Sequence, residues 1–196
     1  MLLEECTSCR RIKFLFKMAL YKMKKIITMF SIVSSLVYSQ NLFAKDQCSI
    51  KEVINLSVLK KNDYKFYNYI CDSDNGSYLK SYIGSQKNKV FVGEYSDFAA
   101  KESPELLAVS IYKAKTKKPP LLITLNSASY CCTPQMEGRM YQVNLYQMSL
   151  PESMILKNIT NIFGANAEGF DGKVEGRVHY NYKTIAEIKK WLDKNY

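Results

Sequence analysis

The strongest constraint on the fold of this chain is a series of short segments in which apolar and polar residues alternate. Successive side chains of a strand point to opposite faces of its sheet, so a period of two predicts half-buried strands. Turn residues separate the segments at spacings too short for parallel crossovers, which indicates antiparallel hairpins. The segments, rich in Tyr, Val, Ile and Phe, are residues 64–70, 77–83, 89–95, 106–113, 121–125 and 139–148.

The most regular alternation comes late in the chain, over residues 173–182. Val174 and Val178 fall on one face of the expected strand, and Arg177 and His179 fall on the other. The sequence therefore predicts one amphipathic strand that presents the only histidine on its polar face.

The C-terminal residues predict an amphipathic helix. Thr184 and Glu187 have the spacing of a capping box, in which each side chain binds a backbone N–H of the first turn. An apolar stripe follows at helical spacing: Ile185, Ile188, Trp191 and Leu192. We therefore predict an α+β fold: a single domain with a mainly antiparallel β-sheet and a C-terminal amphipathic helix packed on one face.

Two other segments leave alternatives open. Residues 155–163 have apolar positions at helical spacing and end at Gly164, but their first residues equally fit the end of a strand. Residues 49–58 begin like a capped helix and continue with the alternation of a strand.

The N-terminal region predicts export. Residues 23–44 have the pattern of a signal peptide: two lysines, an apolar run of twelve residues, and a small residue, Ala44, before charge resumes. Residues 1–22 are then a non-native or mis-assigned extension, with the true start at Met1, Met18 or Met23. The apolar run is too short and too polar at its end for a membrane anchor. We expect a single exported domain over residues 45–196, periplasmic or secreted, with no transmembrane anchor after cleavage.

Export halves the net charge. The whole chain carries +10, from 28 Lys+Arg and 18 Asp+Glu. Residues 1–44 hold seven of the basic and two of the acidic residues, which leaves 21 against 16, or +5. The remaining charge is scattered apart from a lysine cluster at residues 113–118. This excludes a nucleic-acid partner and leaves anionic glycan as an alternative ligand of the cluster.

Four cysteines remain after cleavage: Cys48, Cys71, Cys131 and Cys132. An even number in an exported chain predicts disulfides. A bridge between the adjacent Cys131 and Cys132 would close a strained ring, so we predict two longer bridges that join this pair to Cys48 and Cys71.

The sequence contains no pattern for a cofactor or a metal. One histidine is too few for most zinc hydrolase sites, and neither a glycine-rich phosphate loop nor a G-x-S-x-G elbow occurs. An enzyme is therefore the weaker expectation. In that case the chain would be a small envelope hydrolase that uses carboxylates or a thiol of Cys131 or Cys132.

A small exported domain without a catalytic constellation is more typical of a binding protein. We predict a binding or inhibitor-type protein with a protein partner in the cell envelope, one concrete form of which is an immunity factor against an envelope-acting enzyme. The expected contact surfaces are a loop over residues 126–138 and the polar face of residues 173–181. Their candidate residues are Tyr130, Gln135, Glu137, Arg139, Lys173, Glu175, Arg177, His179 and Asn181.

Tyrosine is the other unusual feature of the composition. Of the 15 tyrosines, all but Tyr21 and Tyr38 lie in residues 45–196, and many fall on the predicted strands. Tyrosine is common both at half-buried sheet positions and at protein interfaces. Their number predicts at least one exposed aromatic patch.

The export prediction can be checked by mass. Protein purified from its native host should begin at Lys45, because cleavage after Ala44 removes the signal peptide. Intact-protein mass spectrometry measures this directly, and an N-terminus that retains residues 23–44 would contradict it.

Overall fold

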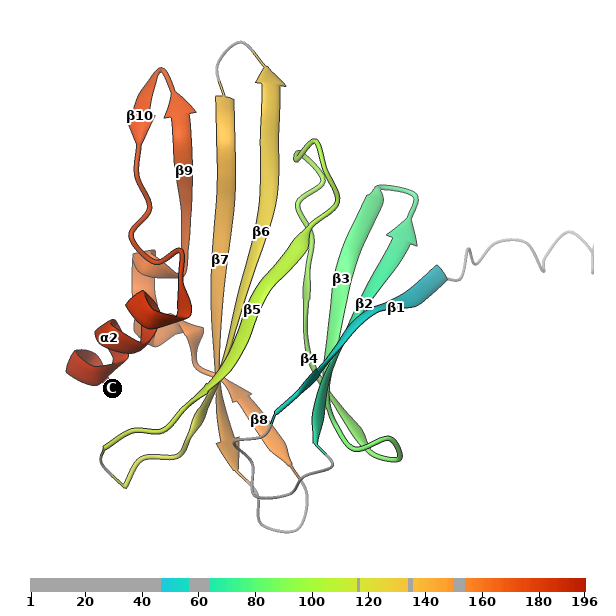
Figure 1. The fold of residues 1–196 in the computed structure, drawn as a ribbon, viewed down its shortest axis with the longest axis vertical. Helices are drawn as coiled ribbons and strands as arrows, with labels where there is room; N and C mark the ends of the chain where they lie inside the picture. Colours follow the sequence, from blue (N-terminus) through green and yellow to red (C-terminus); the bar gives the residue numbers. More distant parts are fainter. Residues whose placement is uncertain (1–46, 57–63, 116, 134–135, 150–153) are drawn as a thin grey trace, which may run out of the picture. The chain divides into compact units, whose positions relative to one another are not determined.

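Two antiparallel sheets form most of the structure, a computed structural model that describes residues 47–56, 64–115, 117–133, 136–149 and 154–196 (Figure 1). Sheet A has the strand order β1-β2-β3-β4, and sheet B has the order β10-β9-β7-β6-β5, with β8 paired to β7. The strands of sheet A are β1 (Gln47–Asn55), β2 (Lys65–Ser73), β3 (Gly76–Gly84) and β4 (Lys89–Tyr95). Those of sheet B are β5 (Glu105–Tyr112), β6 (Leu121–Thr133), β7 (Met136–Ser149), β8 (Ile155–Asn158), β9 (Glu168–Val174) and β10 (Gly176–Val178).

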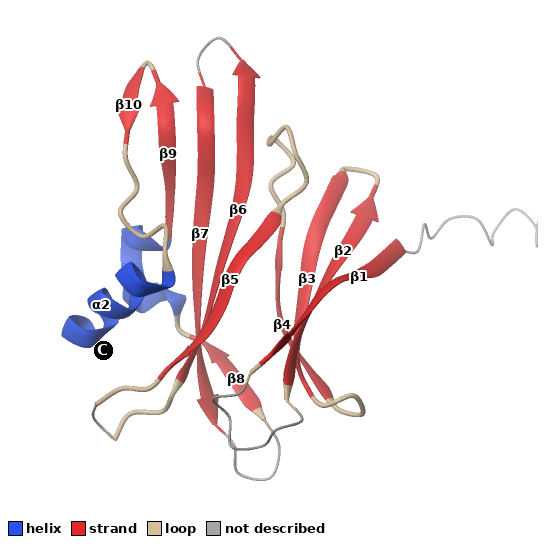
Figure 2. Cartoon of the chain, in the orientation of Figure 1, coloured by secondary structure: helices blue, strands red, loops and turns tan. Residues whose placement is uncertain are grey.

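Helical structure is confined, within the described residues, to the last third of the chain (Figure 2). It consists of 3₁₀ turns η2 (Thr160–Ala167), interrupted at Gly164, and the C-terminal helix α2 (Ile185–Asn195). The predicted antiparallel pairing and C-terminal helix are confirmed. The prediction of one α+β sheet is too simple, because the chain is mostly β and divides its strands between two sheets.

The predicted strand over residues 173–182 is wrong. The chain reverses at Glu175, whose φ of 53° lies in the left-handed region, and β9 and β10 pair across this turn. Lys173 lies opposite Arg177 in the hairpin, with an odd number of residues between them. Residues that pair across such a hairpin are both odd-numbered or both even-numbered, and they lie on the same face of the sheet. The alternation of polar and apolar residues therefore continues through the turn as it would in one strand.

The predicted loop over residues 126–138 is also wrong. Strand β6 continues to Thr133, and β7 already begins at Met136. The small residues Asn126, Ser127 and Ala128 have little preference for strands, but here they are buried and pair with β7. Tertiary packing therefore decides the conformation of this segment.

The two open segments resolve as strands. Residues 47–55 form β1, and the chain after Met154 forms β8 before it enters the 3₁₀ turns. Residues 155–163 thus contain no α-helix, because β8 pairs with β7 and Thr160 continues this contact by binding the backbone of Leu145.

The two sheets share a buried apolar cluster. Its members are Leu56, Phe66, Ile83, Val92, Ile111, Leu122, Tyr146, Met148 and Met154, which come from both sheets. The alternate residues of β5, β6 and β7 belong to a second cluster that also contains Phe163 of η2 and Ile188 and Leu192 of α2: Tyr112, Leu121, Ile123, Leu125, Val143 and Leu145. Sheet B therefore buries apolar side chains on both of its faces.

The capping box of α2 is formed as predicted. The Glu187 backbone N–H donates to Thr184 Oγ1 at 3.3 Å, and the Thr184 N–H donates to Glu187 Oε2 at 3.0 Å. Each bond satisfies an N–H group that the first helical turn leaves without an intrahelical partner.

The predicted disulfide pairing is wrong. Cys48 lies opposite Cys71 in the β1–β2 pair, and these two residues are bonded to each other. Cys131 is also disulfide-bonded, but it lies in the β6–β7 hairpin of the other sheet, where Cys131 and Cys132 together oppose Glu137 in a β-bulge. The pairing register of β1 and β2 brings Cys48 and Cys71 together, and this register cannot be read from the sequence.

The Cys48–Cys71 disulfide fits an extracellular or secreted protein. No helix among the described residues is long and apolar enough to cross a membrane. The predicted extension and signal peptide, residues 1–44, lie outside the described residues.

The Cys48–Cys71 bridge should stabilise the protein measurably. It closes a loop between residues 23 positions apart, so Cys48→Ala/Cys71→Ala should lower the free energy of unfolding by about 3 kcal/mol. Urea denaturation without reductant measures the change. The neighbouring exposed substitution Ser49→Ala is the control, and an unchanged midpoint in the double variant would contradict the expectation.

Candidate functional site

The predicted contact residues divide between several places. Glu137, Lys173 and Arg177 lie side by side in register across β7, β9 and β10. Arg139 lies in the next row on the same face and contacts Glu105 at 2.9 Å. The structure therefore brings together four of the nine candidates, one acidic and three basic, as a charged band on sheet B.

The other candidates are not part of this band. Tyr130 donates a hydrogen bond to the carboxylate of Asp97 at 2.6 Å and contacts the ring of Phe170. Glu175 is at the β9–β10 turn, and Asn181 is exposed beyond β10. Gln135 lies outside the described residues.

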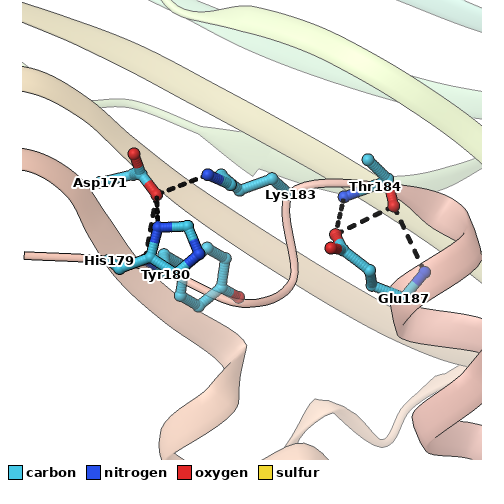
Figure 3. A network of polar contacts seen from close by, with 6 residues as sticks. All are labelled: Asp171, His179, Tyr180, Lys183, Thr184 and Glu187. Carbon is cyan, nitrogen blue, oxygen red and sulfur yellow. Dashed lines mark hydrogen bonds and ion pairs between the residues drawn. The ribbon is translucent and has the colours of Figure 1, made fainter.

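His179 belongs to a network centred on Asp171, which the sequence did not single out (Figure 3). Lys183 Nζ donates to Asp171 Oδ2 at 2.6 Å, and the Tyr180 backbone N–H donates to the same oxygen at 3.1 Å. His179 Nδ1 lies 2.9 Å from it as well. The hydrogen bond from Lys183 is the main reason that the pKa of the Asp171 carboxyl is lowered below its usual value.

Tyr180 holds this network against the sheet. Its hydroxyl donates to the Asn166 carbonyl at 2.5 Å, and its ring stacks on Tyr141 with centroids 5.7 Å apart. The ring lies directly over Gly169, where a Cβ atom would come within 2.1 Å of it. Glycine at this position is therefore required for the close approach that places His179 and Lys183 around Asp171.

The Asp171 network is suited to fixing the chain and offers no nucleophile. One carboxylate oxygen accepts hydrogen bonds from Lys183 and the Tyr180 N–H and lies beside His179, and no hydroxyl or thiol of the described residues hydrogen-bonds to His179. No group of three His, Cys, Asp or Glu residues in the described part of the chain could hold a metal ion. The thiol version of the hydrolase alternative also loses Cys131, since that residue is disulfide-bonded.

A second surface, the outer face of sheet A, is largely apolar. Cross-strand register arranges its side chains in rows. The central row runs Val53–Tyr67–Tyr82–Phe91 across all four strands. The adjacent row runs Ile50–Tyr69–Lys80–Glu94, and a third contains Asn55, Lys65, Gly84 and Lys89.

The apolar side chains of this face are open to solvent at both sheet edges. Ile50 is 57% exposed, Val53 43% and Phe91 49%. Between them the rings of Tyr69, Tyr82 and Phe91 make successive edge-on contacts, with centroids 5.7 and 5.6 Å apart. The predicted aromatic patch therefore lies on the outer face of sheet A. Its position follows from the pairing register of the strands and not from any local motif.

The remaining tyrosines of the predicted strands are mainly structural. Tyr78, Tyr95 and Tyr112 are buried. Burial is the main reason that the pKa of the Tyr112 hydroxyl is raised, and this hydroxyl donates to Asp193 at 3.0 Å. The lysine cluster at residues 113–118 is partly tied to the C-terminus, since Lys118 Nζ donates to the Tyr196 carbonyl at 2.8 Å.

Comparison with known proteins adds no family to this description. No family model, no curated protein and no solved structure matches the chain. Any function must therefore be argued from the surfaces themselves.

The Asp171 network makes stability depend on pH. Because the folded pKa of Asp171 is lowered, its charge contributes stability above the unfolded value of 3.8 and loses it as the pH falls through the folded value. Asp171→Asn should therefore be less stable than wild type near neutral pH, and the difference should shrink in acid. Urea midpoints of both proteins, measured from neutral pH to below 3.8, test this.

Removal of Lys183, the main hydrogen-bond donor to Asp171, should give the same dependence of stability on pH. Lys183→Gln takes away the 2.6 Å contact, so its stability difference from wild type should also shrink in acid. A difference between wild type and Asp171→Asn that is constant with pH would show that the carboxylate charge is not the stabilising feature.

Proposed function

We propose that this protein is an exported binding protein of the inhibitor type, whose partner is a protein of the cell envelope. An immunity factor that neutralises an envelope-acting enzyme is its most concrete form. The observation that carries the proposal is the apolar row Val53–Tyr67–Tyr82–Phe91 on the outer face of sheet A, whose two end residues, Val53 and Phe91, are exposed.

The outer face of sheet A has the properties of a protein interface. Contiguous exposed apolar surface marks interaction sites, and binding energy concentrates on aromatic anchors surrounded by polar groups. Phe91 and Tyr82 provide such anchors, and their ring contact fixes them in place before a partner arrives. A surface that is ordered in advance loses less conformational entropy on binding.

Export is the second part of the proposal. The signal-peptide pattern of residues 23–44 and the Cys48–Cys71 disulfide both favour an oxidising compartment such as the periplasm. The bridge joins β1 to β2, so it also secures the edge strand that carries Ile50 and Val53.

Site-specific crosslinking in the native host tests the proposal. A photoreactive phenylalanine analogue at position 91 should form a covalent adduct with an envelope protein, because Phe91 is 49% exposed on the proposed interface. The matched control is position 178 on β10, where Val178 is 41% exposed on the other sheet.

The protective function should also depend on the apolar face. Phe91→Asp, in a strain whose own copy is deleted, should fail to restore resistance to the partner enzyme that wild type restores, at equal protein level. Adducts that form equally from positions 91 and 178, or full resistance with Phe91→Asp, would overturn the proposal.

A further inference from the structure

We propose that the partner bound by the outer face of sheet A is an acidic protein surface, in which carboxylates flank an apolar projection. This inference rests on the proposed function and specifies the chemistry of the partner. It follows from how the charged side chains of this face are placed around its aromatic row.

Two lysines lie along one side of the aromatic row. Lys65 and Lys89 occupy the strands on either side of β3, and the β3 residue between them in the register is Gly84. Glycine is required at this position, because a Cβ atom would come within 2.1 Å of the Asn88 carbonyl oxygen. No ion pair among the described residues involves either lysine, so both charges are available to a partner.

The ammonium group of Lys89 is held in position by aromatic rings. Its Nζ lies 4.0 Å from the centroid of the Tyr67 ring and donates to the Tyr69 hydroxyl at 2.8 Å. A cation over a ring face is attracted to it but keeps its charge. The group is therefore ordered in advance for an incoming anion.

Tyr67 adds a second donor at the same place. Its side chain is only 5% exposed, and its buried hydroxyl has no hydrogen-bond partner among the described residues. A buried polar group without a partner costs free energy, which a new acceptor recovers. A partner carboxylate next to Lys89 would supply the opposite charge at this place, and it could bind the Tyr67 hydroxyl only if the side chains above that hydroxyl moved aside.

The acidic residue of this face is already neutralised. Glu94 Oε1 lies 2.9 Å from Lys80 Nζ, in the row next to the aromatic residues. The four charged side chains in the three rows are Lys65, Lys80, Lys89 and Glu94, which leaves a net charge of two positive units. Complementary charge on the partner is therefore negative.

The same charges argue against a second copy of this chain as the occupant. Face-to-face association would bring the lysines of one copy onto a surface with the same excess positive charge, which is unfavourable. A lipid surface is also a poorer fit, because Lys89 and Lys80 are fixed by contacts at 2.8 and 2.9 Å instead of extending from the surface.

Selection from a random peptide library displayed on phage tests the inference, with the full protein purified from its host as bait. Wild type should enrich peptides in which Asp or Glu flanks Leu, Ile or Phe. Lys65→Glu/Lys89→Glu should shift the enrichment to Lys and Arg. Lys89→Ala should weaken binding of the best peptide by about tenfold or more, measured by calorimetry.

Matched controls separate this inference from the proposed function. Lys173→Glu/Arg177→Glu reverses two exposed charges on sheet B and should leave the selection unchanged, and circular dichroism confirms folding of every variant. If Phe91→Ala abolishes enrichment but the wild-type peptides are not acidic, the face binds protein and the acidic partner is wrong. If neither Phe91→Ala nor the charge reversal changes the selection, both proposals fail.

Two further measurements address the rival occupants. Cosedimentation with vesicles of phosphatidylcholine and phosphatidylglycerol that is lost in Phe91→Asp would assign the face to a membrane and overturn the inference. Self-association of the wild type that Phe91→Asp abolishes, measured by analytical ultracentrifugation, would assign it to a second copy and also overturn it.

Discussion

The structure depends on the burial of both faces of β6 and β7. Leu122 and Tyr146 belong to the cluster between the sheets, while their neighbours Leu121 and Leu145 belong to the cluster that includes α2. Burial of one such side chain contributes about 1.5–3 kcal/mol relative to exposure. The two strands therefore anchor sheet A on one side and the helical segments on the other.

This arrangement explains why one sheet face remains apolar and open. The residues after β7 contribute Phe163, Ile188 and Leu192 to the cluster on the far side of sheet B. Among the described residues, no element covers the outer face of sheet A in the same way, and Ile50, Val53 and Phe91 stay exposed there. An apolar row with rings fixed by mutual contacts, beside two lysines that have no ion pair within the described part of the chain, is the basis for the proposed protein-binding role.

Local sequence patterns predicted the elements well but predicted their partners poorly. Alternation located β2 to β7, and the Thr184–Glu187 spacing located the start of α2. The prediction from alternation failed at Glu175, because an odd number of residues separates the paired positions of this hairpin and the alternation runs through the turn without a break. Pairing errors have a common cause. Which cysteines meet, and which tyrosines share a row with Phe91, depends on strand register, and register arises from contacts between segments distant in sequence.

The proposed interface requires that Val53 and Phe91, at the two ends of the apolar row on sheet A, are open to solvent while similar residues inside the protein are not. Carbene footprinting read out by mass spectrometry measures this directly in the isolated protein. We expect strong labelling of Phe91 and Val53 and weak labelling of the fully buried Phe66 and Phe163. Labelling of Phe91 no stronger than that of Phe66 would show that this face is covered in the isolated protein and cannot be the free binding surface.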